Sequence, residues 1–534
     1  MSLWNKKESQ SAIVTSSSQL CSALQNVYGI EEKNGQQEKY CIFYFPKTSF
    51  ADATLRESEN FRKLKNKAEF FDDIFLAFEP GEEGEAEKAE FIKCFGKANY
   101  HELDTKQNDL KKVLPIKVRE DVSVACAIRK QAAEDLNRKV QETLSQIGKP
   151  VMYDYRVFPL LMEIYLKQKE AEKTENYQAL YIVHAKNAEK NEKCITLKTF
   201  DKRILSMEKA TVTLREVQKK RITKAEPNFY HTLEFLEEAD KNGISYYQVM
   251  TMLEMLYRNG LIPFYKTNGT RIPESLRTSL IENTSLAFPT NDFFRWIQEH
   301  IKNRELPQRC ICEKNEASGI CLRHNDAVSL FSIYDMAGKE ERQLLDYLVQ
   351  RQFAVYFDAA IEECYQFKAD CAGVELCGEK SCLLQAGWKT AYGESSASAE
   401  SLFEKEEFLI DKIEKLPFAQ HELMTFQSLC QKLKVSCCGD TYEILRIFDL
   451  FFHRQKNPWL ITESGYYLLN DEGKTFFASF EGKPQAFSLS VMTYLWQLTE
   501  DTKEGKLPLT SFQRQRREKE DMLVSELKRC ISRT

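Results

Sequence analysis

Two kinds of hydrophobic spacing alternate along the chain, and together they predict both helices and strands. Between residues 123 and 147, apolar side chains recur every three or four positions, which predicts an amphipathic helix that ends at Gly148. Short apolar runs at 40–45 and 74–78 flank a polar, helix-compatible stretch, so this part predicts strand, helix, strand. Three further runs, at 180–183, 194–197 and 211–214, have the spacing of an antiparallel sheet.

The middle of the chain predicts two helices and a short apolar run. Residues 229–239 and 246–258 have helical spacing, and an Asn-Gly turn closes each segment. The run 261–265 that follows is apolar and strand-like. This order resembles part of a winged-helix module.

A linker separates this region from a third pattern. Residues 393–401 are small and polar, which is typical of a flexible linker, and cleavage near an exposed linker is an expected mode of regulation. Beyond it we expect helices at 406–416, 425–433 and 440–452, a hairpin of 459–462 with 466–469, and a closing helix from residue 470. This order resembles a winged helix-turn-helix domain over residues 404–480, which implies either DNA or protein as the partner.

These patterns predict an α+β, helix-rich multidomain protein with a C-terminal winged-helix-like domain. The expected divisions are an α/β N-terminal domain (1–118), a mixed helical and antiparallel-sheet domain (119–305), a cysteine-rich region (306–390), a linker (391–403), the winged-helix-like domain (404–480) and a C-terminal helical tail (481–534).

The composition excludes several classes of protein. Of the 534 residues, 43% are hydrophobic and 29% are charged, which is the range of folded rather than disordered chains. No run approaches the roughly 18 apolar residues of a spanning helix, and the N-terminus lacks the pattern of a signal peptide. The 16 cysteines are too few for a disulfide scaffold. We therefore expect a cytoplasmic protein that does not enter a membrane.

The net charge restricts nucleic-acid binding to local patches. Lysine and arginine number 75 against 80 aspartates and glutamates, so the whole chain, at −5, lacks a basic field. The strongest basic segment lies between Lys202 and Lys224, with eight basic residues against three acidic ones when Asp201 is counted. It is the candidate nucleic-acid contact. The segment 404–480 has nine basic and twelve acidic residues, which favours a protein partner for it.

A cysteine-rich stretch suggests structural zinc. Zinc takes four thiolate or imidazole ligands, and ligands close in sequence reach one ion through a tight turn. Cys310, Cys312, Cys321 and His324 are the candidate ligands, in a glycine-containing segment. The spacing differs from the usual pair of cysteines two residues apart, and unligated cysteines packed as small apolar side chains are the alternative.

Two arginine and histidine pairs suggest a second kind of chemistry. Arg295 with His300 and Arg446 with His453 have the loose spacing of HEPN-type ribonucleases, which they resemble, and such a pair would act on the 2′-hydroxyl and the phosphate of RNA. About one such match is expected by chance in a chain of this composition. The alternative for His453 is a helix end, where a cationic imidazole meets the carboxyl-terminal dipole.

No strong catalytic motif is present in the sequence. It contains no nucleophile elbow, phosphate-binding loop, metalloprotease helix or phosphatase loop. We therefore expect a non-enzymatic intracellular regulatory or adaptor protein that binds a protein or nucleic-acid partner. The alternative expectation is a ribonuclease that uses the Arg/His pairs.

Overall fold

The computed structural model describes most of the chain. The described residues are 10–18, 20–21, 24–25, 40–45, 54–67, 71–79, 82–103, 116–118, 120–145, 155–174, 180–187, 193–277, 280, 292–301, 304–312, 318–323, 330–396, 404–416, 423–437, 441–453, 458–463, 465–480 and 488–531. None of the helices in these ranges combines the length and the apolar composition that crossing a membrane requires.

The N-terminal part is a sheet with helices on it. The first four strands in the order β2-β1-β3-β4 are parallel, and β5 adds an antiparallel edge. Alternating side chains of β1 enter two hydrophobic clusters on opposite faces, since Val14 belongs to one cluster and Ile13 to the other. The elements are β1 (Gln10–Thr15), β2 (Tyr40–Tyr44), η1 (Thr54–Glu57), α3 (Glu59–Asn66), β3 (Phe71–Leu76), α4 (Glu82–Phe95), β4 (Tyr100–Glu102) and β5 (Ile116–Lys117).

Six strands form a closed barrel in the order β11-β12-β7-β6-β13-β8. Three of them are long, and the 14 residues of β8 correspond to about 45 Å of extended chain. Alternating apolar residues fill the barrel, Val212 and Leu214 of β8 among them. The elements are β6 (Leu180–Asn187), β7 (Cys194–Thr199), η4 (Lys202–Ser206), β8 (Thr211–Lys224), β11 (Ala360–Cys371), β12 (Val374–Gln385) and β13 (Glu407–Leu416).

The remaining elements are mostly helical, and one large hydrophobic cluster joins many of them. Between the barrel strands lie α7 (Thr232–Lys241), α8 (Tyr246–Arg258), β9 (Ile272–Pro273), α9 (Glu274–Arg277), α11 (Asp292–Ile301), η5 (Gln308–Cys310), β10 (Ile311–Cys312), α12 (Leu330–Met336), α13 (Lys339–Ala354) and η6 (Gly387–Tyr392). The others are α5 (Glu120–Ser145), η3 (Tyr155–Val157), α6 (Phe158–Thr174), α14 (Phe426–Ser436), α15 (Thr441–Phe451), β14 (Leu460–Glu463), β15 (Tyr466–Leu469), α16 (Asp471–Ala478), α17 (Leu489–Lys503) and α18 (Leu509–Ile531).

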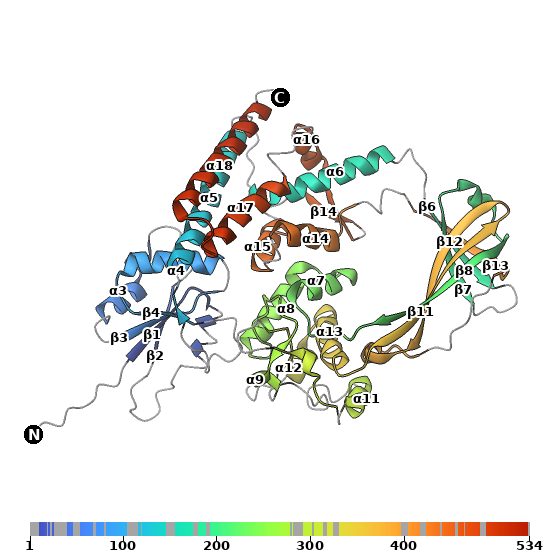
Figure 1. The fold of residues 1–534 in the computed structure, drawn as a ribbon, viewed down its shortest axis with the longest axis horizontal. Coiled ribbons are helices and arrows are strands. Elements are labelled where there is room, and N and C mark those ends of the chain that lie inside the picture. The colour runs from blue at the N-terminus through green and yellow to red at the C-terminus, as the bar shows by residue number, and fades with distance from the viewer. Residues whose placement is uncertain are drawn as a thin grey trace, which may run out of the picture.

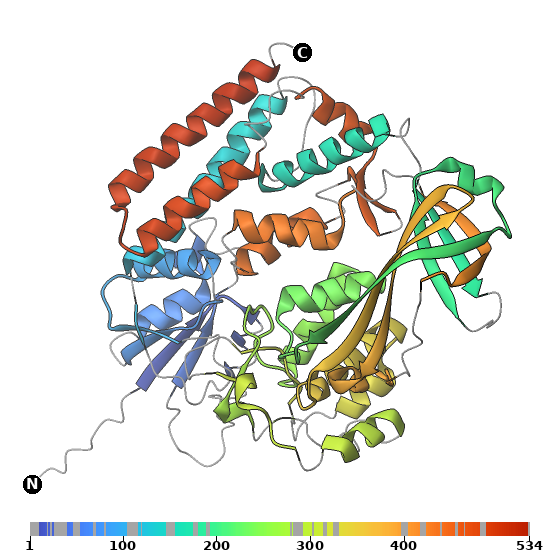
Figure 2. The same cartoon turned by 45° about the vertical axis from the view of Figure 1, so that its right-hand side comes forward.

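These parts are arranged as a ring (Figure 1). The barrel lies at the right of the view, α6, α14 and α15 above the centre, and α7, α8 and α13 below it. The chain leaves the helices for the barrel after α6 and returns to them along β8. Figure 2 shows α5, α17 and α18 side by side above the N-terminal sheet. The ring is therefore built from segments that lie far apart in the sequence.

Several predicted elements are confirmed. The helix expected at 123–147 is α5, and the strand, helix, strand order expected at 40–78 is β2, α3 and β3. The segments at 180–183 and 194–197 pair antiparallel as β6 and β7, whereas β8 pairs with β11 and β13. The mixed helix and strand content of a multidomain protein is thus confirmed.

The helix expected at 406–416 is wrong, because this segment is strand β13. Phe408 and Ile410 point into the barrel while Leu409 is exposed, which is the two-residue period of a strand. The backbone of β13 pairs with β6 and β8, and this pairing overrides the local helical pattern. The structure contains the expected helices α14 and α15, the hairpin β14–β15 and the helix α16. The prediction of a winged-helix-like domain also required a first helix at 406–416, and that helix is absent because the segment is β13. The division at 391–403 stays a prediction, and residues 397–403 lie outside the described part.

Candidate functional site

The carboxyl end of the N-terminal sheet carries a cluster of polar residues. Strand order reverses between β1 and β3, and in parallel sheets the crevice outside such a reversal is a common ligand site. Ser16 follows β1, and its hydroxyl donates a hydrogen bond to the buried carboxylate of Glu87 on α4. Glu79 follows β3, and its carboxylate lies 3.9 Å from the amino group of Lys266. This ion pair joins the sheet to the helical part of the chain.

Lys266 belongs to residues 259–271, which we call the junction loop. The loop connects α8 to β9 without forming a helix or strand, yet Leu261 and Ile262 are buried. Loops usually lie on the surface, because a buried loop must find partners for its backbone polar groups. A buried loop at the meeting point of separate parts of the fold is therefore a candidate functional element.

Hydrogen bonds to two neighbouring segments fix the junction loop. The amide of Thr267 donates to the Thr232 hydroxyl over 2.8 Å, and the Thr267 hydroxyl donates to the Ser318 carbonyl over 2.7 Å. The amide of Arg323 donates to the Leu261 carbonyl over 2.7 Å. These bonds satisfy buried polar groups and hold Lys266 toward Glu79.

Aromatic side chains of the junction loop pack against rings of α8 and α15. Phe264 stacks on Tyr442 of α15 with ring centroids 5.9 Å apart and meets Tyr257 of α8 edge-on at 5.6 Å. Burial raises the pKa of both Tyr257 and Tyr265, and the Glu79 carboxylate raises each pKa further. A hydroxyl nucleophile is activated by a base or by a lowered pKa. Both phenols are therefore protonated at neutral pH and are not activated in this conformation.

The basic segment predicted from the sequence lies on η4 and β8. Strand β8 carries five basic residues and one acidic residue. Glu363 of β11 holds two of the cations, since its carboxylate lies 2.8 Å from Lys219 and 3.4 Å from Arg221. Lys220 is exposed and, within the described residues, makes no ion pair.

Glu363 is the electrostatic centre of this part of the sheet. Its carboxylate is buried and also accepts a hydrogen bond from the Tyr365 hydroxyl over 2.5 Å. The bond to Lys219 and the bond to Tyr365 lower the pKa of Glu363 to about 2. Glu363 is therefore ionised at neutral pH and orients the outer ends of two cationic side chains.

One edge of β8 is open over most of its length. Its first residues pair with β13, but beyond Leu214 the edge opposite β11 has no partner strand among the described residues. Charged side chains are typical of such an edge, because they prevent pairing with another chain. Here they also place cations beside free backbone donors and acceptors, which is suited to binding a polyanion.

The two Arg/His pairs lie in separate places, one on α11 and the other on and just after α15. Arg295 on α11 pairs with Asp292 over 2.7 Å, and His300 donates through Nδ1 to the Trp296 carbonyl over 2.9 Å. Arg446 on α15 pairs with Glu443 over 2.9 Å. His453 lies two residues beyond the end of α15. These contacts are of a kind found within helices, and they do not test the role of the two pairs.

The zinc candidates lie in a buried segment. Cys310, Cys312 and Cys321 are buried, while His324 lies outside the described residues. Burial raises the pKa of the Cys310 thiol and raises that of Cys321 to about 12. In the described ranges, no group of three or more histidine, cysteine, aspartate or glutamate residues could hold a metal ion. Structural zinc stays a prediction.

Sequence reasoning missed the junction. It predicted only a short apolar run at 261–265 and assigned no role to Glu79. A signal was present in the single lysine that follows the apolar run, between two Asn-Gly pairs. The partner of that lysine follows β3, so only the folded chain identifies the pair.

The chain is similar to known proteins over much of its length. The family model described as DNA topoisomerase matches residues 158–433, just over half of the chain. A DNA topoisomerase 1 of Archaeoglobus fulgidus is 22% identical over 437 residues, which is 76% of this chain. The chain spans 64% of the length of that relative. The structure of full-length topoisomerase I from Thermotoga maritima has a TM-score of 0.66 at 15% identity and covers 96% of this chain and 90% of that one.

These similarities correct three expectations. A family resemblance limited to residues 404–480 is wrong, because the match spans 158–433 and includes the barrel and the junction loop. The non-enzymatic regulatory or adaptor function is wrong, and so is the ribonuclease, since the match is to enzymes that act on DNA. All three errors arose because the charge and spacing of short segments were interpreted without the fold that combines them.

Proposed function

Because this chain belongs to the DNA topoisomerase family, we propose that it binds DNA and holds one strand between the open edge of β8 and the junction loop. The observation that carries the proposal is the family match over residues 158–433, which includes both of these elements. The net charge of the chain is negative, so DNA must be held by local groups.

The DNA backbone is expected to lie along the open edge of β8. Lys219, Lys220 and Arg221 follow one another on this strand, so they project to both of its faces beside the free edge. A phosphate chain that runs along the edge is within reach of cations from both faces. The Glu363 carboxylate holds Lys219 and Arg221, so it competes with phosphate for these two cations.

The proposal is tested by measuring the binding of a fluorescent single-stranded oligonucleotide and of its duplex over a range of salt concentrations. The triple variant Lys219→Gln, Lys220→Gln, Arg221→Gln is expected to bind about tenfold or more weakly and to lower the salt slope by about 2. The matched control replaces three exposed lysines of β6 and β13, Lys186, Lys412 and Lys415, by glutamine. Equal losses in the two triple variants, or no binding by the unmodified chain, would overturn the proposal.

Strand breakage and rejoining at the junction is a second candidate function. It is favoured by Tyr257 and Tyr265, which both interact electrostatically with the Glu79 carboxylate, because a tyrosine can form a covalent intermediate. The measurement is the linking number of a negatively supercoiled plasmid. A change in linking number that is abolished by Tyr257→Phe or by Tyr265→Phe supports this candidate. If the chain binds the plasmid but leaves its linking number unchanged, the candidate is rejected.

A further inference from the structure

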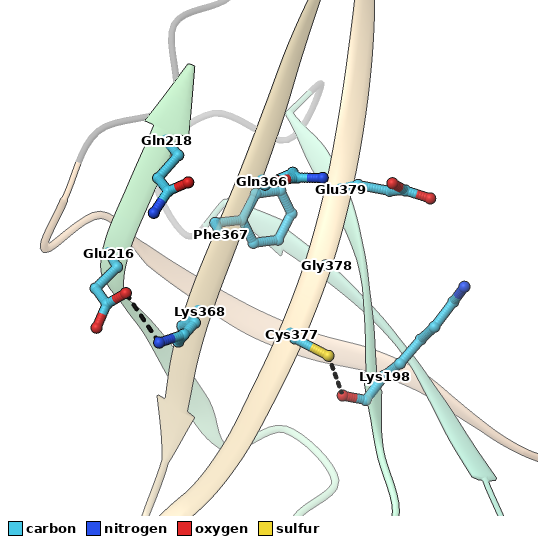
Figure 3. A pocket seen from close by; sticks show the side chains of 9 residues that line it. All are labelled: Lys198, Glu216, Gln218, Gln366, Phe367, Lys368, Cys377, Gly378 and Glu379. Carbon is cyan, nitrogen blue, oxygen red and sulfur yellow. Dashed lines mark hydrogen bonds and ion pairs between the residues drawn. The ribbon is translucent and has the colours of Figure 1, made fainter. Parts of the chain in front are cut away.

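A pocket of about 360 Å³ opens on the barrel beside the basic edge of β8 (Figure 3). Its volume is at the lower end of the range for small-ligand sites. The pocket lies outside the junction and has no part in the ion pairs of Glu363. Its lining residues are Lys198, Glu216, Gln218, Gln366, Phe367, Lys368, Cys377, Gly378 and Glu379.

Strand register arranges most of these side chains in two rows. One row crosses from Glu216 to Lys368, Cys377 and Lys198, and the other crosses from Gln218 to Gln366 and Glu379. Directly opposed residues in a sheet have Cβ atoms roughly 5 Å apart, so Gln218 and Gln366 are neighbours on β8 and β11, with the Gln366 amide directed toward Glu379. Figure 3 shows both amides with the Phe367 ring between the strands.

Gly378 keeps the floor of the pocket open to the ring of Phe367. A Cβ atom at this position would lie 2.5 Å from the ring of Phe367 and 2.6 Å from the Thr196 carbonyl oxygen. Glycine therefore allows the ring to lie beneath β12 at the centre of the two rows. The pocket thus combines an apolar floor with a polar rim.

The rim has groups that can bind both parts of a nucleotide. Glutamine amides can pair with the hydrogen-bonding edge of a base, as they do with adenine. In the described part of the chain, neither Gln218 nor Gln366 makes a side-chain hydrogen bond, so both can accept a ligand. Lys368 is held by Glu216 at 3.1 Å, whereas Lys198 is exposed and, among the same residues, makes no ion pair. Lys198 is therefore the cation that can meet a phosphate.

We propose that this pocket receives one unpaired nucleotide of the DNA strand bound along β8, with its base turned from the edge toward the two glutamine amides. This inference rests on the proposed function, because the strand must first lie along the edge of β8. A base can enter the pocket only after it has left the base stack, which costs free energy in a duplex and little in an unpaired strand. We therefore expect the chain to prefer single-stranded DNA.

Two exposed cysteines on the same barrel provide the test. Cys377 lines the pocket, and Cys194 lies on β7 outside it. The full chain is alkylated with N-ethylmaleimide, and the rate at each cysteine is measured by mass spectrometry with no DNA, with a twelve-nucleotide oligo-dA, with the matching duplex, and with dAMP. A saturating single strand is expected to slow alkylation of Cys377 at least fivefold and to leave Cys194 unchanged.

The variants separate the pocket from general DNA binding. Gln218→Ala combined with Gln366→Ala is expected to abolish the protection of Cys377, and both positions are exposed, so the barrel is retained. The matched control is Lys202→Ala with Lys209→Ala, which removes two exposed cations outside the pocket and is expected to keep the protection.

The outcomes distinguish this inference from the proposed function. An oligonucleotide that binds without protecting Cys377, or a duplex that protects it equally, overturns the pocket and leaves DNA binding intact. No oligonucleotide binding at all overturns the proposed function. If dAMP protects Cys377 at the same concentration as the oligonucleotide, the pocket binds free nucleotides, and the inference that it receives a nucleotide of the bound strand is overturned.

Discussion

The amino group of Lys266 lies 3.9 Å from the carboxylate of Glu79, and this ion pair connects the junction loop to the N-terminal sheet. Glu79 follows the central strand β3, whereas Lys266 follows α8 and lies within the segment matched by the topoisomerase family model. The side chains are 15% and 23% exposed, so water screens the pair only in part. Electrostatic coupling between these two parts of the fold is therefore expected to be measurable.

Glu79→Gln is expected to lower the free energy of unfolding by about 1 kcal/mol, because it leaves the partly buried Lys266 without its carboxylate. Urea unfolding followed by circular dichroism measures this loss. The control is Glu59→Gln, which breaks the exposed Glu59–Lys63 pair on α3 and is expected to cause no measurable loss. Equal effects of the two substitutions would contradict the coupling.

His231 is expected to make stability depend on pH between about 6.5 and 4. Its Nδ1 accepts a hydrogen bond from the Glu234 amide at the start of α7, and burial lowers its pKa from 6.5 to about 4. The unfolded chain binds the proton more tightly, so stability is complete above pH 6.5 and falls by up to about 3 kcal/mol as the pH approaches 4.

His231→Asn keeps an N-cap oxygen without a titrating ring. The difference between the unfolding free energies of the two proteins, measured from pH 7 to 4.5, is expected to shift in favour of the variant as the pH falls. A difference that does not change with pH would show that His231 is not the group responsible.

Glu363→Gln is expected to strengthen DNA binding several-fold while making the fold less stable. The substitution frees Lys219 and Arg221 for phosphate but removes the buried carboxylate that orients them. Oligonucleotide binding at low and moderate salt measures the first effect, and the thermal midpoint measures the second. Glu375→Gln, which removes an exposed acid from β12, is the control for a loss of negative charge alone.

Glu363 also makes stability depend on pH, but for a different reason from His231. Hydrogen bonds to its charged form lower the pKa of Glu363, whereas burial lowers that of His231. The pKa of Glu363 is lowered from 4.5 to about 2, so its stabilising contribution is present above pH 4.5 and is lost as the pH falls toward 2. Glu363→Gln is expected to remove this part of the acid sensitivity. If the acid unfolding curves of the variant and the unmodified chain coincide, Glu363 does not contribute to the acid sensitivity.

Gly378→Ala is expected to destabilise the barrel by about 1–3 kcal/mol, because the added methyl group would overlap the Phe367 ring and a backbone carbonyl oxygen. Thermal unfolding checks the value. Gly338→Ala is the matched control, since a Cβ there would meet only Glu341 Oε2 at 3.7 Å. A tolerated substitution at Gly378 would mean that Phe367 has room to move.

Buried thiols are expected to react far more slowly than exposed ones. The Cys321 thiol is buried and its pKa is raised to about 12, so iodoacetamide at pH 8 should modify Cys194 and Cys377 first and Cys321 only on unfolding. Elemental analysis of the same preparation tests the zinc prediction. About one zinc per chain that is lost in Cys310→Ser would support it, and a metal-free chain with equally protected thiols would favour simple packing.

The sequence by itself determined the elements whose hydrophobic period is long or unambiguous. Helix α5 and the strand, helix, strand order of β2, α3 and β3 follow from it, because a repeated period reports which face of an element is buried. The cationic character of β8 is also visible in the sequence. Its partner Glu363 is not, because it belongs to a strand that follows α13.

The tertiary structure alone decided how these elements combine. The segment 407–416 is compatible with both helical and strand periods, and it became a strand because β6 and β8 supply backbone partners. Glu79 and Lys266 meet, and the junction loop is buried, through packing between distant segments. The spacing of residues along the chain shows which side chains of a segment are buried. Which distant residue each of them contacts depends on how the whole chain folds.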